Sequence, residues 1–249
     1  TATTSASVTV NKATPTITTA PTATGITYGQ TLASSTLSGG VASVSGSFAF
    51  TTPSTVPNAG TASQSVTFTP TDTVNYNTAT TSSSVTVGKA TPTITTPPTA
   101  TAITYGQTLG SSTLSGGVAS VPGSFAFTTP STAPSAGTAS QGVTFTPTDT
   151  ANYNNATTSA SVTVNQRPVQ LTGSRTYDGT TGASATILSV GNKAGSDVVT
   201  VVSGSGTLAS KNVGAWAISS FGSLALGGAA VANYTLTGAS GSVTISAAT

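Results

Sequence analysis

The stretch V-T-F-T-P-T-D-T-V-N-Y-N-T-A-T-T-S-S-S-V-T-V runs from Val66 to Val87 and recurs almost unchanged from Val143 to Val164. Apolar and polar residues alternate at both of its ends, which is typical of half-buried strands. Between these ends, a proline and Asp72 indicate a turn, and a tyrosine follows four residues after the aspartate. The stretch therefore predicts a strand, a corner and a returning strand.

The chain around this stretch is repetitive. Residues 12–88 (repeat 1) align without a gap with residues 89–165 (repeat 2), a period of 77 residues with 11 differences. Such near-identity indicates duplicated units in series. Residues 1–11 match the last strand of a repeat, so we expect either the remainder of a preceding domain or a strand donated to one. Residues 166–249 (the C-terminal segment) also end in Asn-Tyr and a Ser-Val-Thr strand, which predicts a third, diverged domain.

Composition favours an all-β fold without catalytic groups. Threonine supplies 56 of 249 residues, only ten residues are charged, and the chain has no Glu, His, Cys or Met. Threonine and valine favour strands, and strong helix formers are scarce. Without His and Cys, the chain lacks the usual ligands of zinc and the commonest general base and nucleophile. We therefore expect no enzyme, no cofactor and no metal site.

Short strands at close spacing predict a small β-sandwich for each unit. In repeat 1 we expect strands over residues 14–19, 25–32, 46–52, 62–69, 76–81 and 83–87. In the C-terminal segment we expect them near residues 169–171, 183–187, 198–202, 216–221 and 234–236. The expected inward side chains of repeat 1 are Ile17, Ile26, Tyr28, Leu32, Leu37, Val41, Phe48, Phe50, Val66, Phe68, Tyr76, Val85 and Val87. Proline-rich joins at residues 91–98 and 167–168 favour an elongated rod.

The spacing from Asp72 to Tyr76 recurs from Asp149 to Tyr153, and Tyr234 holds the same place in the C-terminal segment. It resembles the tyrosine corner of immunoglobulin-like sandwiches, where the hydroxyl returns to backbone a few residues upstream. The resemblance implies that these aspartates and tyrosines form structural corners. The cysteine that follows in antibody domains is absent.

Further motifs extend the resemblance over nearly the whole chain. Residues 12–165 resemble bacterial surface repeats called MBG domains of the YGX type, through I-T-Y-G-Q-T-L at Ile26 and Ile103 and the F-T-P-T-D-x-x-N-Y block. Residues 166–249 resemble the YDG domain, through Y-D-G at residues 177–179, K-N-V-G at 211–214 and N-Y-T-L at 233–236. Such domains form stalks or arrays in secreted, filamentous-haemagglutinin-like adhesins. The resemblance leaves a β-grasp-like fold as an alternative to the sandwich.

Several residues allow a sharper interpretation. Asp72 could hold calcium with nearby asparagines, but calcium takes six to eight oxygens, so we favour a turn hydrogen bond. Lys12 could form an isopeptide bond with an asparagine, but we favour a solvent-facing lysine. Trp216 could be a platform for sugar, although its alternation with Ile218 favours burial.

Two asparagines, Asn155 and Asn233, match the N-glycosylation pattern, which a threonine-rich chain also produces by chance.

These observations predict a structural stalk or adhesive array segment of a large secreted bacterial surface protein, located outside the cell. The expected partners are neighbouring copies or domains of the same protein, with host or environmental glycans or proteins as alternatives. An extracellular filament assembled by strand donation is a second function, and a carbohydrate-binding module a third. The sequence has no basic stripe for nucleic acid and no apolar run of membrane-spanning length.

Overall fold

The computed structural model describes residues 3–248. It is 51% strand and 5% helical, so the predicted all-β fold class is confirmed. The helices within residues 3–248 are short 3-10 turns, η1 (Leu32–Ser34), η2 (Leu109–Ser111), η3 (Ala185–Ile187) and η4 (Val231–Asn233). No α-helix is present in this range on which a β-grasp sheet could pack. Within the same range, no helix has the length and apolar character needed to cross a membrane.

The chain forms two compact units. The first holds the chain up to Thr93 together with Ala119–Ser124 and Thr146–Ala156. The second holds Ile94–Val118, Phe125–Phe145 and the chain from Thr157 onward. Each unit therefore contains part of repeat 2. The predicted domain limits at residues 88 and 165 stay predictions, and the two units are described separately below.

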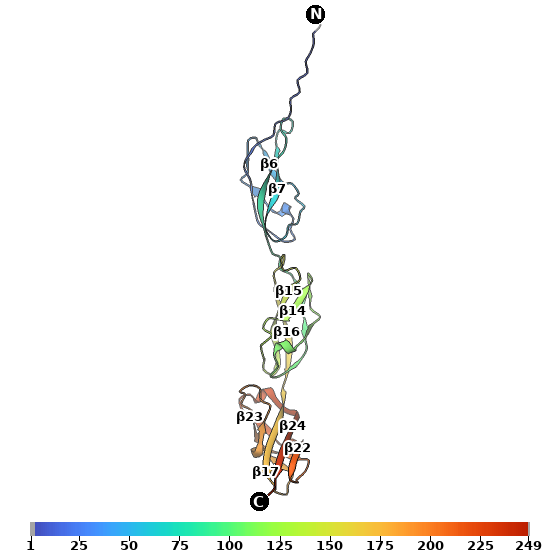
Figure 1. Ribbon diagram of the computed structural model, residues 1–249, viewed down its shortest axis with the longest axis vertical. Helices are drawn as coiled ribbons and strands as arrows, with labels where there is room; N and C mark the ends of the chain where they lie inside the picture. The colour runs from blue at the N-terminus through green and yellow to red at the C-terminus, as the bar shows by residue number, and fades with distance from the viewer. Residues whose placement is uncertain (1–2, 249) are drawn as a thin grey trace. The chain divides into compact units, whose positions relative to one another are not determined.

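The main sheet of repeat 1 has four strands in the order β3 (Ile26–Thr27), β8 (Ala79–Gly88), β7 (Gly60–Pro70) and β6 (Gly46–Phe50). β3 is parallel to β8, and the other pairs are antiparallel. Figure 1 shows β6 beside β7. Two short antiparallel pairs complete the repeat: β1 (Ile17–Thr19) with β5 (Val41–Ala42), and β2 (Thr22–Ala23) with β4 (Leu37–Ser38). Ala23 of β2 and Leu37 of β4 pack against the buried core of repeat 1, so this pair contributes to the second layer.

The core of repeat 1 is small and follows the predicted alternation. Val66 and Val85 are fully buried, and Phe68 is 1% exposed with its ring 4.9 Å from that of Phe48. One expected core residue is wrong: Val41 is 51% exposed. It lies where the β1–β5 register shifts, and this irregularity leaves its side chain outside the core.

Repeat 2 has the same strand order, with β11 (Ile103–Thr104), β16 (Ala156–Asn165), β15 (Gly137–Pro147) and β14 (Gly123–Phe127). Its short pairs are β9 (Ile94–Thr96) with β13 (Val118–Ala119) and β10 (Thr99–Ala100) with β12 (Leu114–Ser115). The buried valines of repeat 1 have buried counterparts here, including Val143 and Val162. The near-identical sequences therefore build the same core.

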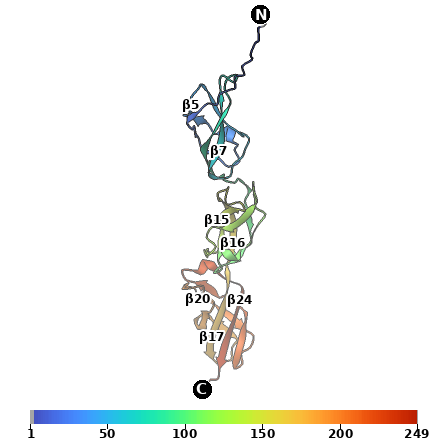
Figure 2. The same ribbon diagram turned by 45° about the horizontal axis from the view of Figure 1, so that its top comes forward.

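The C-terminal segment forms a larger sheet in the order β18 (Gly182–Ser184), β21 (Ser205–Leu208), β22 (Gly214–Ser220), β24 (Tyr234–Ser246), β17 (Arg167–Thr176) and β19 (Leu188–Val190). The parallel neighbours β17 and β24 lie side by side in both ribbon views (Figures 1 and 2). A separate pair joins β20 (Thr200–Ser203) to β23 (Ala225–Gly227).

One strand expected in the C-terminal segment ends early. Residues 185–187 form η3 rather than continuing a strand over residues 183–187, because Ser184 caps a 3-10 turn by accepting the Thr186 N–H. The strands β19, β21 and β23 were not expected from the sequence. β21 and β23 are short and rich in Gly, Ser and Ala, and β19 is only three residues long, too short for its alternation to stand out.

The substitution Phe68→Ala should destabilise repeat 1 by about 3–5 kcal/mol, because it leaves a cavity in a closely packed site. Calorimetry should show the melting transition of repeat 1 at a lower temperature. The matched control is Val56→Ala, whose side chain is 47% exposed. The control should change stability by no more than about 0.5 kcal/mol. Equal effects of the two variants would contradict this assignment of the core.

Candidate functional site

The predicted corner of repeat 1 is a tight hydrogen-bonded turn. Asp72 Oδ1 accepts the N–H groups of Val74 and Asn75, each at 3.1 Å. Asp72 Oδ2 accepts the side-chain Nδ2–H of Asn75 at 2.8 Å, and the Tyr76 N–H donates to the Asp72 carbonyl at 3.2 Å. The hydrogen bond from the Asn75 side chain, followed by that from its backbone, lowers the pKa of Asp72. Within residues 3–248, no group of three metal-binding side chains surrounds this turn.

The corner of repeat 2 has the same geometry. Asp149 Oδ2 accepts the Nδ2–H of Asn152 at 2.8 Å. Lysines close both corners, since Lys12 and Lys89 each donate from Nζ to a corner carbonyl, of Thr73 and Thr150 respectively, at 2.7 Å. The aspartate therefore orients the asparagine amide, and the lysine ties the corner to the first segment of its repeat.

In the first unit, the Asn152 amide that Asp149 orients also bonds to repeat 1. Asn152 Oδ1 accepts the backbone N–H of Ala59 at 2.8 Å, and Asn152 is only 8% exposed. Beside this bond, the rings of Tyr28 and Tyr153 meet edge to face, with centroids 5.3 Å apart and planes at 84°. T-shaped aromatic pairs of this kind are favourable beyond the area they bury. We call this combination of one hydrogen bond and one tyrosine pair the junction contact.

The second unit contains the junction contact again. Asn233 Oδ1 accepts the N–H of Ala136 at 2.9 Å. The rings of Tyr105 and Tyr234 lie 5.5 Å apart with planes at 75°. The alanines of both contacts precede a glycine in the left-handed region, with φ of +122° at residue 60 and +128° at residue 137. This conformation is one that glycine adopts readily.

An acid strengthens the contact in the second unit. Asp197 Oδ2 accepts the hydroxyls of Tyr105 at 2.9 Å and of Tyr234 at 2.8 Å. The Tyr234 hydroxyl in turn accepts the N–H of Ala194 at 2.7 Å, so it does bond to upstream backbone, 40 residues earlier in the chain. Burial, followed by the hydrogen bond to Asp197, raises the pKa of Tyr105. Burial is also the largest cause that raises the pKa of Tyr234.

The sequence indicated the aspartates and tyrosines of these corners, but it did not show that the asparagine before each tyrosine accepts a distant backbone N–H. Asn152 and Asn233 each precede a corner tyrosine, and each accepts a backbone N–H from a position 93 or 97 residues earlier. The signal that could have found them is the Asn-Tyr dipeptide shared by repeat 1, repeat 2 and the C-terminal segment. Its function was hidden because the donor is a backbone group, which leaves no mark in the sequence.

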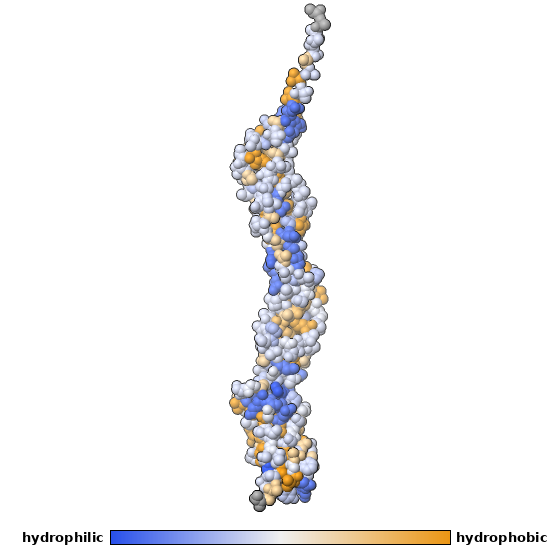
Figure 3. All heavy atoms as spheres, in the orientation of Figure 1, coloured by the Kyte–Doolittle hydropathy of each residue, from blue (hydrophilic) through white to orange (hydrophobic). Residues whose placement is uncertain are grey.

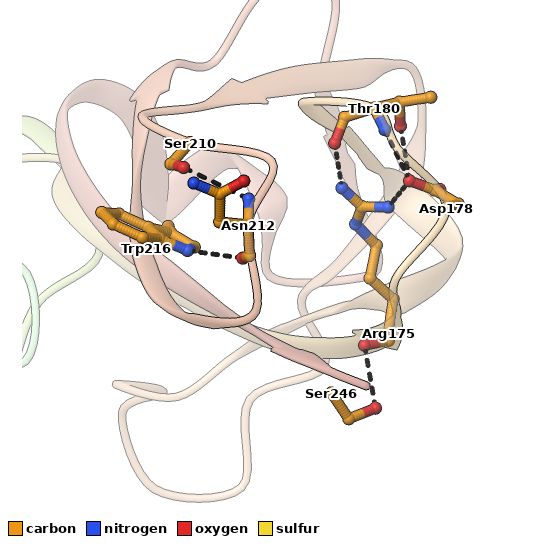
Figure 4. A network of polar contacts seen from close by, with 7 residues as sticks. All are labelled: Arg175, Asp178, Thr180, Ser210, Asn212, Trp216 and Ser246. Atoms are coloured by element: carbon orange, nitrogen blue, oxygen red, sulfur yellow. Dashed lines mark hydrogen bonds and ion pairs between the residues drawn. The ribbon is translucent and has the colours of Figure 1, made fainter. Parts of the chain in front are cut away.

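Of the other predicted site residues, Trp216 and Asn155 do not take part in the junction contacts, whereas Asn233 does. Trp216 is half-buried, packs against the core of the C-terminal segment and donates its indole N–H to the Asn212 carbonyl at 2.7 Å (Figure 4). Asn155 is exposed, whereas Asn233 is half-buried and engaged with Ala136. Part of the Trp216 indole is thus fixed by the fold, and Asn155 is the more accessible of the two glycosylation candidates.

The Tyr-Asp-Gly motif forms a polar turn. Asp178 Oδ1 accepts both the N–H and the hydroxyl of Thr180 at 2.9 Å and forms an ion pair with Arg175 (Figure 4). The Thr180 N–H bond, followed by the Arg175 bond, lowers the pKa of Asp178 from 3.8 to about 2. The turn therefore favours the ionised carboxylate.

The fold and these contacts define the class: a tandem series of small β-sandwich domains. A family model described as the YDG domain matches residues 158–242, which confirms the predicted likeness of the C-terminal segment. The likeness of the repeats to MBG domains stays a prediction. A search of curated proteins finds no match.

Among solved structures, the chain is similar to a Sidekick-1 structure with immunoglobulin domains 1–5. The identity is 11% and the TM-score 0.31, with 94% of this chain and 59% of that chain covered. It is also similar to the I-band fragment I67–I69 of titin, at 8% identity and TM-score 0.32, with 94% and 99% covered. A third, the Drosophila N-cadherin EC1-3 structure, has 9% identity and TM-score 0.24, with 77% and 79% covered.

The substitution Asn152→Ala should expose the Ala59 amide to exchange. The hydrogen bond contributes about 1 kcal/mol, so hydrogen exchange at Ala59 should accelerate roughly fivefold. The matched control is Asn154→Ala, because Asn154 lies two residues away and bonds to Lys89 and Thr91 instead. NMR-detected exchange at Ala59 measures both variants. Unchanged protection in Asn152→Ala would contradict the contact.

The Asp178 turn should make stability depend on acid. The folded-state pKa is lowered, so the stabilising contribution is fully present above pH 3.8 and is lost as pH falls through about 2. The substitution Asp178→Asn should therefore reduce the fall in melting temperature between about pH 5 and about pH 2. Calorimetry of both proteins over this range measures the difference. Identical acid sensitivity would show that Asp178 does not contribute.

Proposed function

We propose that this chain is a structural stalk or adhesive array segment of a large secreted bacterial surface protein, and that it is not an enzyme. The observation that carries the proposal is the junction contact, which the same motif builds once in each unit. A contact that recurs with the repeat suits a chain that extends by adding further repeats. The adhesin resemblance of the motifs supports placement outside the cell.

The surface chemistry supports this proposal. Figure 3 shows a surface that is mostly of intermediate hydropathy with scattered strongly polar patches, in keeping with ten charged residues and abundant threonine. Threonine pairs across neighbouring strands, such as Thr61 with Thr86 and Thr138 with Thr163, join hydroxyls at 3.0 Å. Such cross-strand pairs stabilise sheets without charge. A sheet stabilised in this way loses little to screening by salt outside the cell.

The filament alternative is less well supported by the strand arrangement. Strand donation to a second copy requires a sheet with a vacant position for residues 3–10. In residues 12–248, the last-strand position of each of the three main sheets is filled by the chain's own β8, β16 or β24. A further copy of the same chain therefore offers no vacant last-strand position, and we prefer the stalk or array.

Antibodies against the C-terminal segment should label intact, non-permeabilised cells of the producing organism. The expected result follows from surface placement, and a protease added outside the cells should remove the signal. An antibody against a cytoplasmic protein provides the control and should label permeabilised cells only. Labelling of the chain only after permeabilisation would overturn the proposed surface function.

A further inference from the structure

We propose that the surface around Asn75 and Tyr76 is a docking site for another domain of this repeat class, joined to repeat 1 through residues 3–10. The inference deepens the proposed function, on which it rests, by naming the partner of one surface and the atoms that hold it. It follows from three observations: two occupied copies of the site, one open copy, and an exposed strand beside the open copy.

The accepting half of the junction contact occurs three times in the chain. It is occupied at Asn152–Tyr153 by Ala59 and Tyr28, and at Asn233–Tyr234 by Ala136 and Tyr105. The third copy is Asn75–Tyr76. There, Asp72 holds the amide nitrogen of Asn75 as Asp149 holds that of Asn152, both at 2.8 Å. The Asn75 amide is therefore oriented for the same acceptor role.

The third copy is open to solvent. Asn75 is exposed, whereas Asn152, which bonds to Ala59 of repeat 1, is only 8% exposed. The neighbouring Val74 is 77% exposed. A depression of about 390 Å³ lies here, lined by Val10, Asn11, Lys12, Ala13, Val74, Asn75 and Tyr76. Apolar side chains and a preset acceptor therefore share one exposed surface.

Residues 3–10 indicate what covers this surface. The sequence A-S-V-T-V at residues 6–10 is identical to residues 160–164 of β16. In β16 the two valines are 0% and 4% exposed, whereas Val8 and Val10 are 85% and 87% exposed. A strand with this pattern reaches the same burial only in a sheet of the same kind. Residues 3–10 thus match the last strand of a repeat domain that would sit directly on Asn75 and Tyr76.

The chemistry of the partner follows from the two occupied contacts. It presents a tyrosine from an I-T-Y-G-Q turn to the Tyr76 ring, and an alanine N–H, just before a positive-φ glycine, to Asn75 Oδ1. A complete second copy of this chain does not fit, because its own last strands occupy every position that residues 3–10 would take. The occupant is therefore a repeat domain without a last strand of its own, and residues 3–10 supply that strand to its sheet.

The test uses the full chain extended by a copy of residues 89–155 placed directly before residue 2, which restores one continuous repeat. The chain has no cysteine, so Val10→Cys introduces a unique thiol. Labelling of this thiol should be on the order of 100-fold slower in the extended chain than in the original chain, since a core strand reacts only after local opening. Equal labelling rates would overturn the proposal.

Hydrogen exchange in the extended chain without the cysteine tests the docking itself. The amide of the added copy of Ala136 should exchange as slowly as those of Ala59 and Ala136, which serve as references in the same molecule. The substitution Asn75→Ala should accelerate exchange at the added alanine roughly fivefold and leave the references unchanged. Asn77→Ala is the matched control and should have no such effect, because Asn77 lies two residues away and bonds to Lys12 and Thr14 instead. Free exchange at the added alanine beside protected references would overturn the docking site, whatever the outcome of cell labelling.

Discussion

The hydrogen bond from the Asn152 amide nitrogen to Asp149 is the constraint on which the junction contact depends. An ionised carboxylate only accepts hydrogen bonds, so it selects the nitrogen end of the amide and turns the oxygen toward Ala59. A free amide could present either end. By fixing this choice inside repeat 2, Asp149 prepares an acceptor for the backbone N–H of Ala59 in the preceding repeat. Less conformational entropy is therefore lost when the contact forms.

The C-terminal segment reaches the same result with different residues. Ala230 stands where the repeats have an aspartate, and it accepts only the backbone N–H of Asn233. The acid lies instead at Asp197, where it receives two tyrosine hydroxyls from the two sides of the contact. The acceptor on Asn233 and the paired rings are unchanged. The geometry of the contact is thus the same in both units, but the acid that stabilises it in the second unit, Asp197, lies at a different position in the chain.

A chain with so little charge relies on neutral interactions. In the two repeats, the cores are small and contain alternating valines and phenylalanines, single lysines close the corners, and threonine hydroxyls pair across strands. Small cores give small domains only marginal stability. Contacts that cover a corner, such as the one that buries Asn152, therefore add to stability where the core of each unit can add little.

The sequence by itself determined the strands with clear alternation. Val66 and Phe68 of β7 and Val85 of β8 are buried as their period-two pattern predicts, since that period places them on one face of the sheet. Local sequence could not decide the exposure of Val41, because a register shift between strands sets it. It also could not distinguish Val8 from Val162. The residues around these two valines are identical, yet Val8 is 85% exposed and Val162 is 0% exposed. Burial and the bond from Ala59 to Asn152 depend on which distant segments meet, and only the tertiary structure decides that.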